Sequence, residues 1–216
     1  MGKGKKIIMT CVCLGLIVTF GSVLADKQKL SEGLIRLHVV GESDSQQDQN
    51  IKLKVRDVVI EYLQPAMADI TDASRAKVWV GENLAELEAA ANQTLATLGV
   101  DCGAKISFCR EEFPRRVYDS FTLPAGVYDS LRITIGEGEG KNWWCVVFPT
   151  LCFSATAEEL DSVATGAGFS DSLTGAITGE AGYEVRFFLL DALGRLENMF
   201  ASQELPPVFW TDSVVS

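Results

Sequence analysis

The sequence of 216 residues contains a single histidine, His38, and no pair of cysteines with the spacing Cys-x-x-Cys. Histidine-rich metal sites, zinc ribbons and thioredoxin-like redox centres need several such side chains, so none of them is expected. The chain also lacks the Gly-x-Ser-x-Gly, His-Glu-x-x-His and phosphate-binding-loop patterns of common enzymes. We therefore predict no catalytic residue, no metal ion and no cofactor. The residues leave one enzymatic alternative open, a hydrolase in which His38 acts with a carboxylate.

Basic residues are also scarce. Lysine and arginine total 19 against 29 aspartates and glutamates, which gives a formal net charge of −10. A chain this acidic repels phosphate groups, so we exclude nucleic acid as a partner. Apolar residues make up 47% of the chain and charged residues 22%, which is typical of a globular protein and argues against disorder.

Residues 1–25 have the layout of an export signal. Three lysines precede the uncharged run 7–24, which ends in the small-residue sequence Val23-Leu24-Ala25. This order predicts a secretory signal peptide that is cleaved before Asp26. The run is also just long enough to span a bilayer, so the alternative is an uncleaved anchor that keeps residues 7–24 in the membrane. In both cases the rest of the chain, with 16 basic and 29 acidic residues, is expected to be exported.

Strand and helix patterns follow this segment. Residues 34–40 alternate between apolar and polar side chains, which predicts a half-buried strand with Arg36 and His38 on its exposed face. Helical spacing then predicts three helices, at about 46–63, 72–80 and 83–98. Pro65 is expected to limit the first helix, because proline disrupts a helix interior. The predicted buried stripe of that helix consists of Ile51, Val55, Val58 and Tyr62.

From residue 104 onward the apolar period is two, which predicts further strands. Glycines alternate with glutamates at 136–140, and we expect this loop to connect a hairpin whose second strand is 143–148. The order of elements predicts an α+β fold in two layers, with helices covering a mostly antiparallel sheet in a domain of residues 26–153.

The remainder of the chain divides in two. Residues 154–182 are rich in Ala, Gly, Ser and Thr and are predicted to form a flexible linker. Residues 183–216 are predicted to form a C-terminal amphipathic helix and tail. The apolar positions of this helix are Val185, Phe188, Leu189, Ala192, Leu193, Leu196, Met199 and Phe200. We expect this face to dock on the domain, and the alternative is a helix that lies on a membrane or binds a partner.

Two tryptophans and two cysteines lie close together within residues 143–152. The four cysteines of the exported part allow three disulfide pairings. A bridge between Cys145 and Cys152 would close a short loop and stabilise the fold by about 2–3 kcal/mol, so we predict it. Cys102 and Cys109 lie too far apart to be joined if the strand between them is straight. Trp143 and Trp144 either pack in the core or form an exposed contact for a partner.

A cluster of mixed charge is expected where the strand 34–40 meets the helix 46–63. It is either a surface network of ion pairs or a recognition patch in which arginines bind carboxylates of a receptor. The predicted partner-binding residues are Arg36, His38, Asp44, Asp48, Lys52, Arg56, Trp143 and Trp144.

Two long motifs resemble a known family. The first runs from Ile35 to Asp57 and contains Ile-Arg-Leu-His-Val-Val, Ser-Asp-Ser and Lys-Leu-Lys-Val-Arg-Asp. The second runs from Phe113 to Phe153 and contains Pro-Ala-Gly-Val-Tyr and Gly-Lys-Asn-Trp-Trp-Cys-Val-Val-Phe-Pro. Both motifs resemble stage II sporulation protein R, and residues 184–188 match more weakly. Gly41-Glu42 and Thr150 depart from the family's usual pattern.

The resemblance implies an exported developmental signal of endospore-forming bacteria. Such proteins enter the space between the forespore and mother-cell membranes. There they activate a membrane-embedded aspartic protease, which cleaves the precursor of sigma-E.

A third interpretation is a structural protein bound to the cell wall. It predicts retention on purified wall material and no effect on sigma processing.

Overall fold

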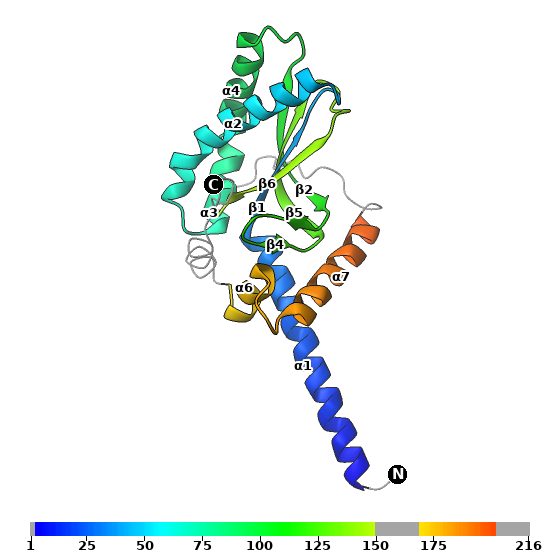
Figure 1. Ribbon diagram of the computed structural model, residues 1–216. Helices are drawn as coiled ribbons and strands as arrows, with labels where there is room; N and C mark the ends of the chain where they lie inside the picture. The colour runs from blue at the N-terminus through cyan, green and yellow to red at the C-terminus, as the bar shows by residue number, and fades with distance from the viewer. Residues whose placement is uncertain (1–2, 150–168, 202–216) are drawn as a thin grey trace.

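The computed structural model describes residues 3–149 and 169–201 (Figure 1). The first half consists of α1 (Lys3–Gly33), β1 (Ile35–Val40), α2 (Gln46–Ala68), α3 (Ala73–Glu82) and α4 (Leu84–Thr97). Then follow β2 (Ala104–Phe113), β3 (Arg116–Val117), β4 (Thr122–Leu123), β5 (Gly126–Ile135), β6 (Asn142–Phe148), α6 (Asp171–Thr178) and α7 (Glu184–Ala201). The predicted α+β class and the C-terminal helix are confirmed.

The main sheet has the strand order β2-β5-β1-β6, so the first strand of the chain lies inside the sheet. β1 is parallel to β5 and antiparallel to β6, while β2 and β5 are antiparallel. The predicted hairpin at 136–140 is therefore wrong, because β1 lies between the two strands that this loop connects. The loop instead bonds to the residues that follow β1, with Gly140 N donating to Gly41 O at 2.9 Å and Glu139 N to Glu42 O at 3.2 Å.

Helix α2 begins where the sequence predicts, since the Ser45 hydroxyl accepts a bond from Asp48 N at 3.0 Å. It does not stop at Pro65 but continues to Ala68. Leu63 and Met67, on either side of the proline, are both buried, and their burial offsets the backbone bond that proline cannot make. The predicted stripe is also corrected, because Tyr62 is exposed and the buried positions shift to Val59 and Ile60.

One hydrophobic core lies between the sheet and helices α2, α3 and α4. Ile35, Leu37 and Val39 of β1 point into it and are fully buried. Helix α4 contributes the buried residues Leu87, Ala91 and Leu95. This half of the fold agrees with the layer that the sequence predicts.

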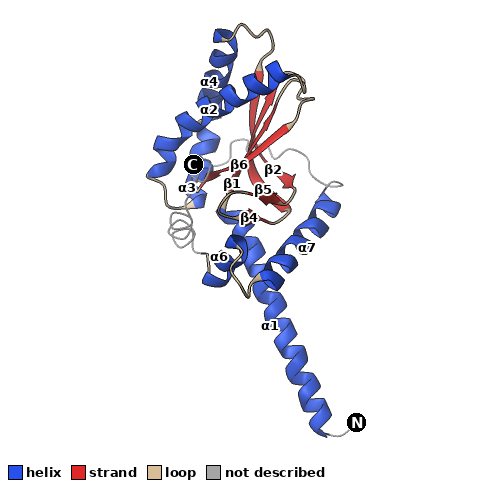
Figure 2. Ribbon diagram, viewed as in Figure 1, coloured by secondary structure: helices blue, strands red, loops and turns tan. Residues whose placement is uncertain are grey.

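A second core covers the opposite face of the sheet, and Figure 2 shows helices on both sides of the strands. It joins strand residues such as Phe113 and Val146 to α1, α6, α7 and the small β3–β4 sheet. All six residues of β1 are consequently buried, so the half-exposed strand predicted from its alternation is wrong. Alternation of apolar and polar residues shows that the two faces of a strand have different surroundings. For β1, the polar face is covered by a second layer of protein and not by water.

The segment predicted as a linker contains a helix. Residues 171–178 form α6, and Leu173, Ala176 and Ile177 are buried in the second core. Ser170 begins the helix by accepting a bond from Leu173 N, and Gly179 ends it with a positive φ of 77°. The linker prediction is thus corrected for this stretch, and its part at 154–168 lies outside the described residues.

Candidate functional site

His38 lies on the second-core face of β1, in a polar cluster enclosed by aromatic rings. Its Nδ1 atom is 3.1 Å from both carboxylate oxygens of Glu111, and its Nε2 is 2.8 Å from Oδ1 of Asn142. The imidazole stacks on Trp144 with ring centroids 3.9 Å apart and an interplanar angle of 16°. His38 is 5% exposed, so the predicted solvent-facing position is wrong. Both ring nitrogens have partners, and neither is left to act on a substrate.

Glu111 connects this histidine to the neighbouring strand. It accepts bonds from the Ser130 hydroxyl at 2.5 Å and from Arg132 Nη1 at 3.3 Å. Burial alone would raise the pKa of Glu111. The hydrogen bond and charge of His38, together with Ser130 and Arg132, outweigh burial and lower this pKa below the usual value of 4.5. Glu111 is therefore an ionised acceptor at neutral pH and a poor general base.

The Glu111 side chain is largely shielded from solvent. Its side chain is 14% exposed, because it lies on the same face of β2 as the fully buried Phe113 two residues later. Residues two apart lie on the same face of a strand, so the large apolar Phe113 was the feature of the sequence that indicated a buried face.

Arg36 occupies the same face of β1 and is fully buried. Its guanidinium lies 4.3 Å from the centroid of Phe113 and 5.0 Å from that of Tyr128, an arrangement that stabilises a buried cation. Nη2 donates to the Tyr118 hydroxyl at 2.9 Å, and Nε donates to the carbonyl of Cys145 at 3.3 Å. Arg36 thus joins the sheet to the second core and does not face a receptor on the surface.

The acidic residues of the predicted cluster lie on the other side of the sheet, at the start of α2. Asp44 accepts a bond from Lys141 N at 2.7 Å. Asp48 accepts bonds from the hydroxyls of Ser43 at 2.5 Å and Ser45 at 2.8 Å. These two bonds, the one from Ser43 first, lower the pKa of Asp48. Both carboxylates therefore fix the loop that connects β1 to α2.

Lys52 is buried in this region, with 4% exposure. Its Nζ donates to Gln49 Oε1 at 2.5 Å and to the carbonyl of Lys141 at 2.7 Å. Burial lowers the pKa of Lys52, and the carboxylate of Asp44 offsets this only in part. Lys52 holds the loop before β6 against α2.

Arg56 and Trp143 form the remainder of the predicted cluster, and the Arg56 side chain is 17% exposed. The Arg56 guanidinium lies 4.3 Å from the centroid of the Trp143 ring, and it pairs with Asp57 at 2.5 Å. Trp143 is 37% exposed, whereas Trp144 is enclosed with His38. The single mixed cluster predicted from the sequence is thus two groups separated by the sheet. None of these contacts tests whether a partner binds there.

The cysteines give a mixed result. Cys145 is buried on β6, and Cys152 lies outside the described residues, so the bridge between them stays a prediction. Cys102, which precedes β2, and Cys109 within it carry free thiols and are not joined to each other. Burial, followed by the charge of Glu111, raises the pKa of Cys109 and keeps this thiol protonated.

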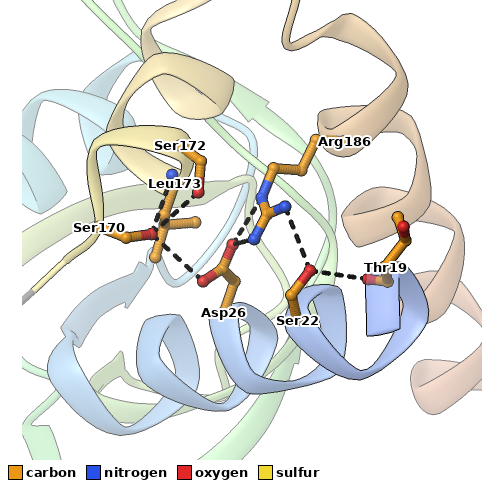
Figure 3. A network of polar contacts seen from close by, with 7 residues as sticks. All are labelled: Thr19, Ser22, Asp26, Ser170, Ser172, Leu173 and Arg186. Carbon is orange, nitrogen blue, oxygen red and sulfur yellow. Dashed lines mark hydrogen bonds and ion pairs between the residues drawn. The ribbon is translucent and has the colours of Figure 1, made fainter. Parts of the chain in front are cut away.

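A third polar network attaches α1 to α6 and α7 (Figure 3). Arg186 Nε donates to Asp26 Oδ2 at 2.7 Å, and its Nη2 contacts the same oxygen. Arg186 also reaches the Ser22 hydroxyl at 3.4 Å, and Ser170 bonds to Asp26 Oδ1 at 3.4 Å. Asp26 is 4% exposed. The residue that would follow signal cleavage is therefore built into the fold.

Helix α1 has two parts with different surroundings. Its stretch from Ile7 to Leu24 exposes large apolar side chains, and Figure 1 shows this end extending away from the rest of the molecule. The helix is long and apolar enough to cross a membrane, as a signal sequence near the N-terminus also is. From Val23 onward one side of α1 packs in the second core.

In the described ranges 3–149 and 169–201, no group of three or more potential metal ligands occurs.

Residues 31–158 match the family described as Stage II sporulation protein R (spore_II_R). The chain is 32% identical over 160 residues to Stage II sporulation protein R of Bacillus subtilis (strain 168). The aligned region covers 69% of this chain and 71% of the relative. No solved structure matches significantly.

Proposed function

Because the chain belongs to the stage II sporulation protein R family, we propose that it is the exported signal that activates a membrane-embedded aspartic protease during endospore formation. The protease then cleaves the sigma-E precursor in the mother cell. The observation that carries the proposal is the family match, which spans β1 to β6 and so includes both motifs identified in the sequence. The family is named for sporulation and not for an enzyme activity.

Helix α1 supports export into the space between the two membranes. Its apolar stretch precedes a folded domain, which is the arrangement of a secreted or membrane-anchored protein. An uncleaved α1 would hold the domain at the membrane surface, where a membrane-embedded protease presents its outer face. Cleavage would release the domain into the same space.

The polar residues support a ligand more than a catalyst. His38, the single histidine, has a partner at each ring nitrogen and is enclosed by Trp144. A ligand activates a receptor by binding its active state more tightly than its inactive state, and this needs a shaped surface instead of a reacting group. Arg56 and Trp143 remain proposed contacts for the protease, since Trp143 is exposed on the edge strand β6 and Arg56 of α2, which covers its ring, keeps part of its surface exposed.

A hydrolase that uses His38 is the second candidate, because the structure does place a carboxylate beside the imidazole. A base oriented by a carboxylate is the usual arrangement of such enzymes. Here, however, Asn142 occupies the nitrogen that would receive the substrate proton. Processing that survives in a folded His38→Gln protein would remove this candidate, and processing that fails although the protein folds would favour it.

The proposed function is tested by co-expression in a host that does not sporulate. Cells carry the protease and the sigma-E precursor, with and without this chain, and immunoblots follow the size of the precursor. We expect cleavage only when the full chain is present. A chain lacking residues 1–25 is the matched control and should leave the precursor uncut. Cleavage at the same rate without the full chain would contradict the proposal.

A further inference from the structure

Helix α7 attaches to the sheet through one narrow side. Leu190, Asp191 and Gly194 are its buried residues. Asp191 accepts a bond from Ala125 N at 2.9 Å, and Gly194 lies so close to this turn that an added Cβ would be 1.6 Å from the Ala125 carbonyl oxygen. The position of α7 is therefore fixed by this backbone contact together with the buried Leu190 and the partly buried Leu189 and Leu193.

The most exposed apolar side chains of α7 lie on the other side of the helix. We call them the α7 stripe, and its members are Val185, Phe188, Leu196, Met199 and Phe200. Their exposure ranges from 49% at Leu196 to 70% at Val185. The spacing of 3, 8, 3 and 1 residues keeps them on one face of a helix. The predicted docking on the domain therefore holds for Leu189 and Leu193, which pack against the second core, but not for the stripe. An exposed apolar face of this kind indicates an unsatisfied contact.

A pocket of about 330 Å³ opens beside the N-terminal end of the stripe. Its walls come from α6, α7 and the β3–β4 region, with Ile177, Phe187 and Phe188 as apolar lining. Arg115 and Glu184 are charged residues of the same lining, and the Arg115 guanidinium lies 4.9 Å from the Phe187 ring. A concave apolar site next to an exposed aromatic ring has the form of a site that receives an anchoring side chain.

The stripe lies close to the segment that is able to cross a membrane. Arg186, next to Val185, is bonded to Asp26 and Ser22 of α1. Further along α7, Glu197 pairs with Lys27 of α1 at 2.5 Å. Both tethers fall where the exposed apolar part of α1 ends at Leu24. With α1 in the bilayer, α7 is therefore held near the membrane surface.

Lipid is a poor match for the stripe. Amphipathic helices that bind membranes carry free basic residues on their polar face. The two arginines of α7 are instead paired, Arg186 with Asp26 and Arg195 with Asp191. The chain has a net charge of −10, which disfavours an anionic surface. A lipid surface would also leave the pocket without a side chain to fill it.

We propose that the α7 stripe and the adjacent pocket bind an apolar helical segment of a membrane-embedded partner protein. The inference rests on the proposed function and identifies that partner with the protease. A side chain of the partner fills the pocket between Phe187 and Ile177, and its helix lies along the stripe. This is recognition of a helix in a groove, in which the helix contributes apolar side chains at spacings of three, four and seven residues.

Substitution on the stripe tests the proposal in the co-expression host. The double variant Phe188→Ser, Leu196→Ser removes two exposed apolar side chains that make little contact with the fold. We expect its melting temperature to match that of the unmodified chain and precursor cleavage to fall about tenfold or more, as when an interface anchor is truncated. Val78→Ser is the matched control, because Val78 is 60% exposed on α3, outside the stripe. It should leave cleavage unchanged.

A photo-crosslinking residue at position 188 identifies the occupant directly. An adduct with the protease, lost when the crosslinker is moved to position 78, supports the proposal. Adducts restricted to lipid, to a second copy of this chain or to the chain itself would overturn it. Wild-type cleavage by the stable double variant would also overturn it while leaving the proposed function intact. If the unmodified chain fails to trigger cleavage at all, the proposed function fails first.

Discussion

His38 and Glu111 are bound to each other across an intervening strand. His38 belongs to β1 and Glu111 to β2, and β5 lies between them and supplies Ser130 and Arg132 to the same carboxylate. Asn142 of β6 completes the set on the other side of β1. Each of the four neighbouring strands thus contributes a polar side chain to one connected network. Such a network fixes the register of the strands, because slipping by one residue would move its members to the opposite face.

The first prediction concerns the stability that Glu111 provides. Glu111→Gln keeps the size of the side chain but removes the charge that faces His38 and Arg132. We expect the free energy of unfolding to fall by about 1–3 kcal/mol, because buried donors lose their acceptor. Urea denaturation of the purified domain measures this loss. Glu139→Gln is the control, since Glu139 is exposed, and an equal loss there would refute a specific role for Glu111.

The second prediction concerns the loss of stability at acidic pH. The pKa of Glu111 is lower in the folded protein than its usual 4.5, so between the two values the unfolded chain binds more protons. Its stabilisation is therefore complete above about pH 4.5 and is lost as the pH falls through the lower folded value. Unfolding curves from pH 6 to pH 3 should show a steeper decline for the unmodified protein than for Glu111→Gln. Parallel declines would contradict this assignment.

The third prediction uses two glycines in helices. Gly194→Ala places a Cβ against the backbone of Ala125, so α7 must move away from the sheet. We expect a lower melting temperature and faster proteolysis within residues 184–201. Gly81→Ala in α3 meets no atom within 4 Å, and it should stabilise the protein by up to about 1 kcal/mol. Equal effects of the two substitutions would show that the close approach of α7 does not matter.

The sequence was sufficient for one half of this fold and not for the other. Local apolar spacing located the helices α2 and α3, and the structure shows Ser45 and Asp72 as their N-terminal caps. Alternation likewise located β1 but could not say what covers the face of Arg36 and His38. That cover comes from α1, α6 and α7, which are distant in sequence, and strand order depends on the same long-range pairing. The expected exposure of Arg36 and His38 was wrong for this reason, because the second core buries both residues.

The fourth prediction follows from the packing of α1. Val23 is fully buried in the second core, although it precedes the expected cleavage point. A domain that begins at Asp26 loses this side chain and the Ser22 contact of Arg186, while one that begins at Ser22 keeps both. We expect the longer form to be more stable by about 1–2 kcal/mol, the usual cost of emptying a small apolar site. Thermal unfolding of the two purified forms measures this difference. Equal stability would show that residues 22–25 do not stabilise the fold.

The fifth prediction separates support of the fold from recognition at Arg56. This guanidinium covers the Trp143 ring and pairs with Asp57, so Arg56→Glu removes one cation–π contact and one partly exposed ion pair. Each is worth about 1 kcal/mol at most at such positions, and the melting temperature should stay within a few degrees.

If Arg56 binds a carboxylate of the protease, reversing its charge introduces repulsion at the contact, and cleavage of the sigma-E precursor should collapse although the protein stays folded. Lys54→Glu makes the same change in charge at an exposed position on the same helix, so it controls for the general increase in acidity. A loss of cleavage in Arg56→Glu but not in Lys54→Glu is the expected result. Normal cleavage by a normally folded Arg56→Glu protein would leave Arg56 with a structural role alone, that of holding Trp143 against α2.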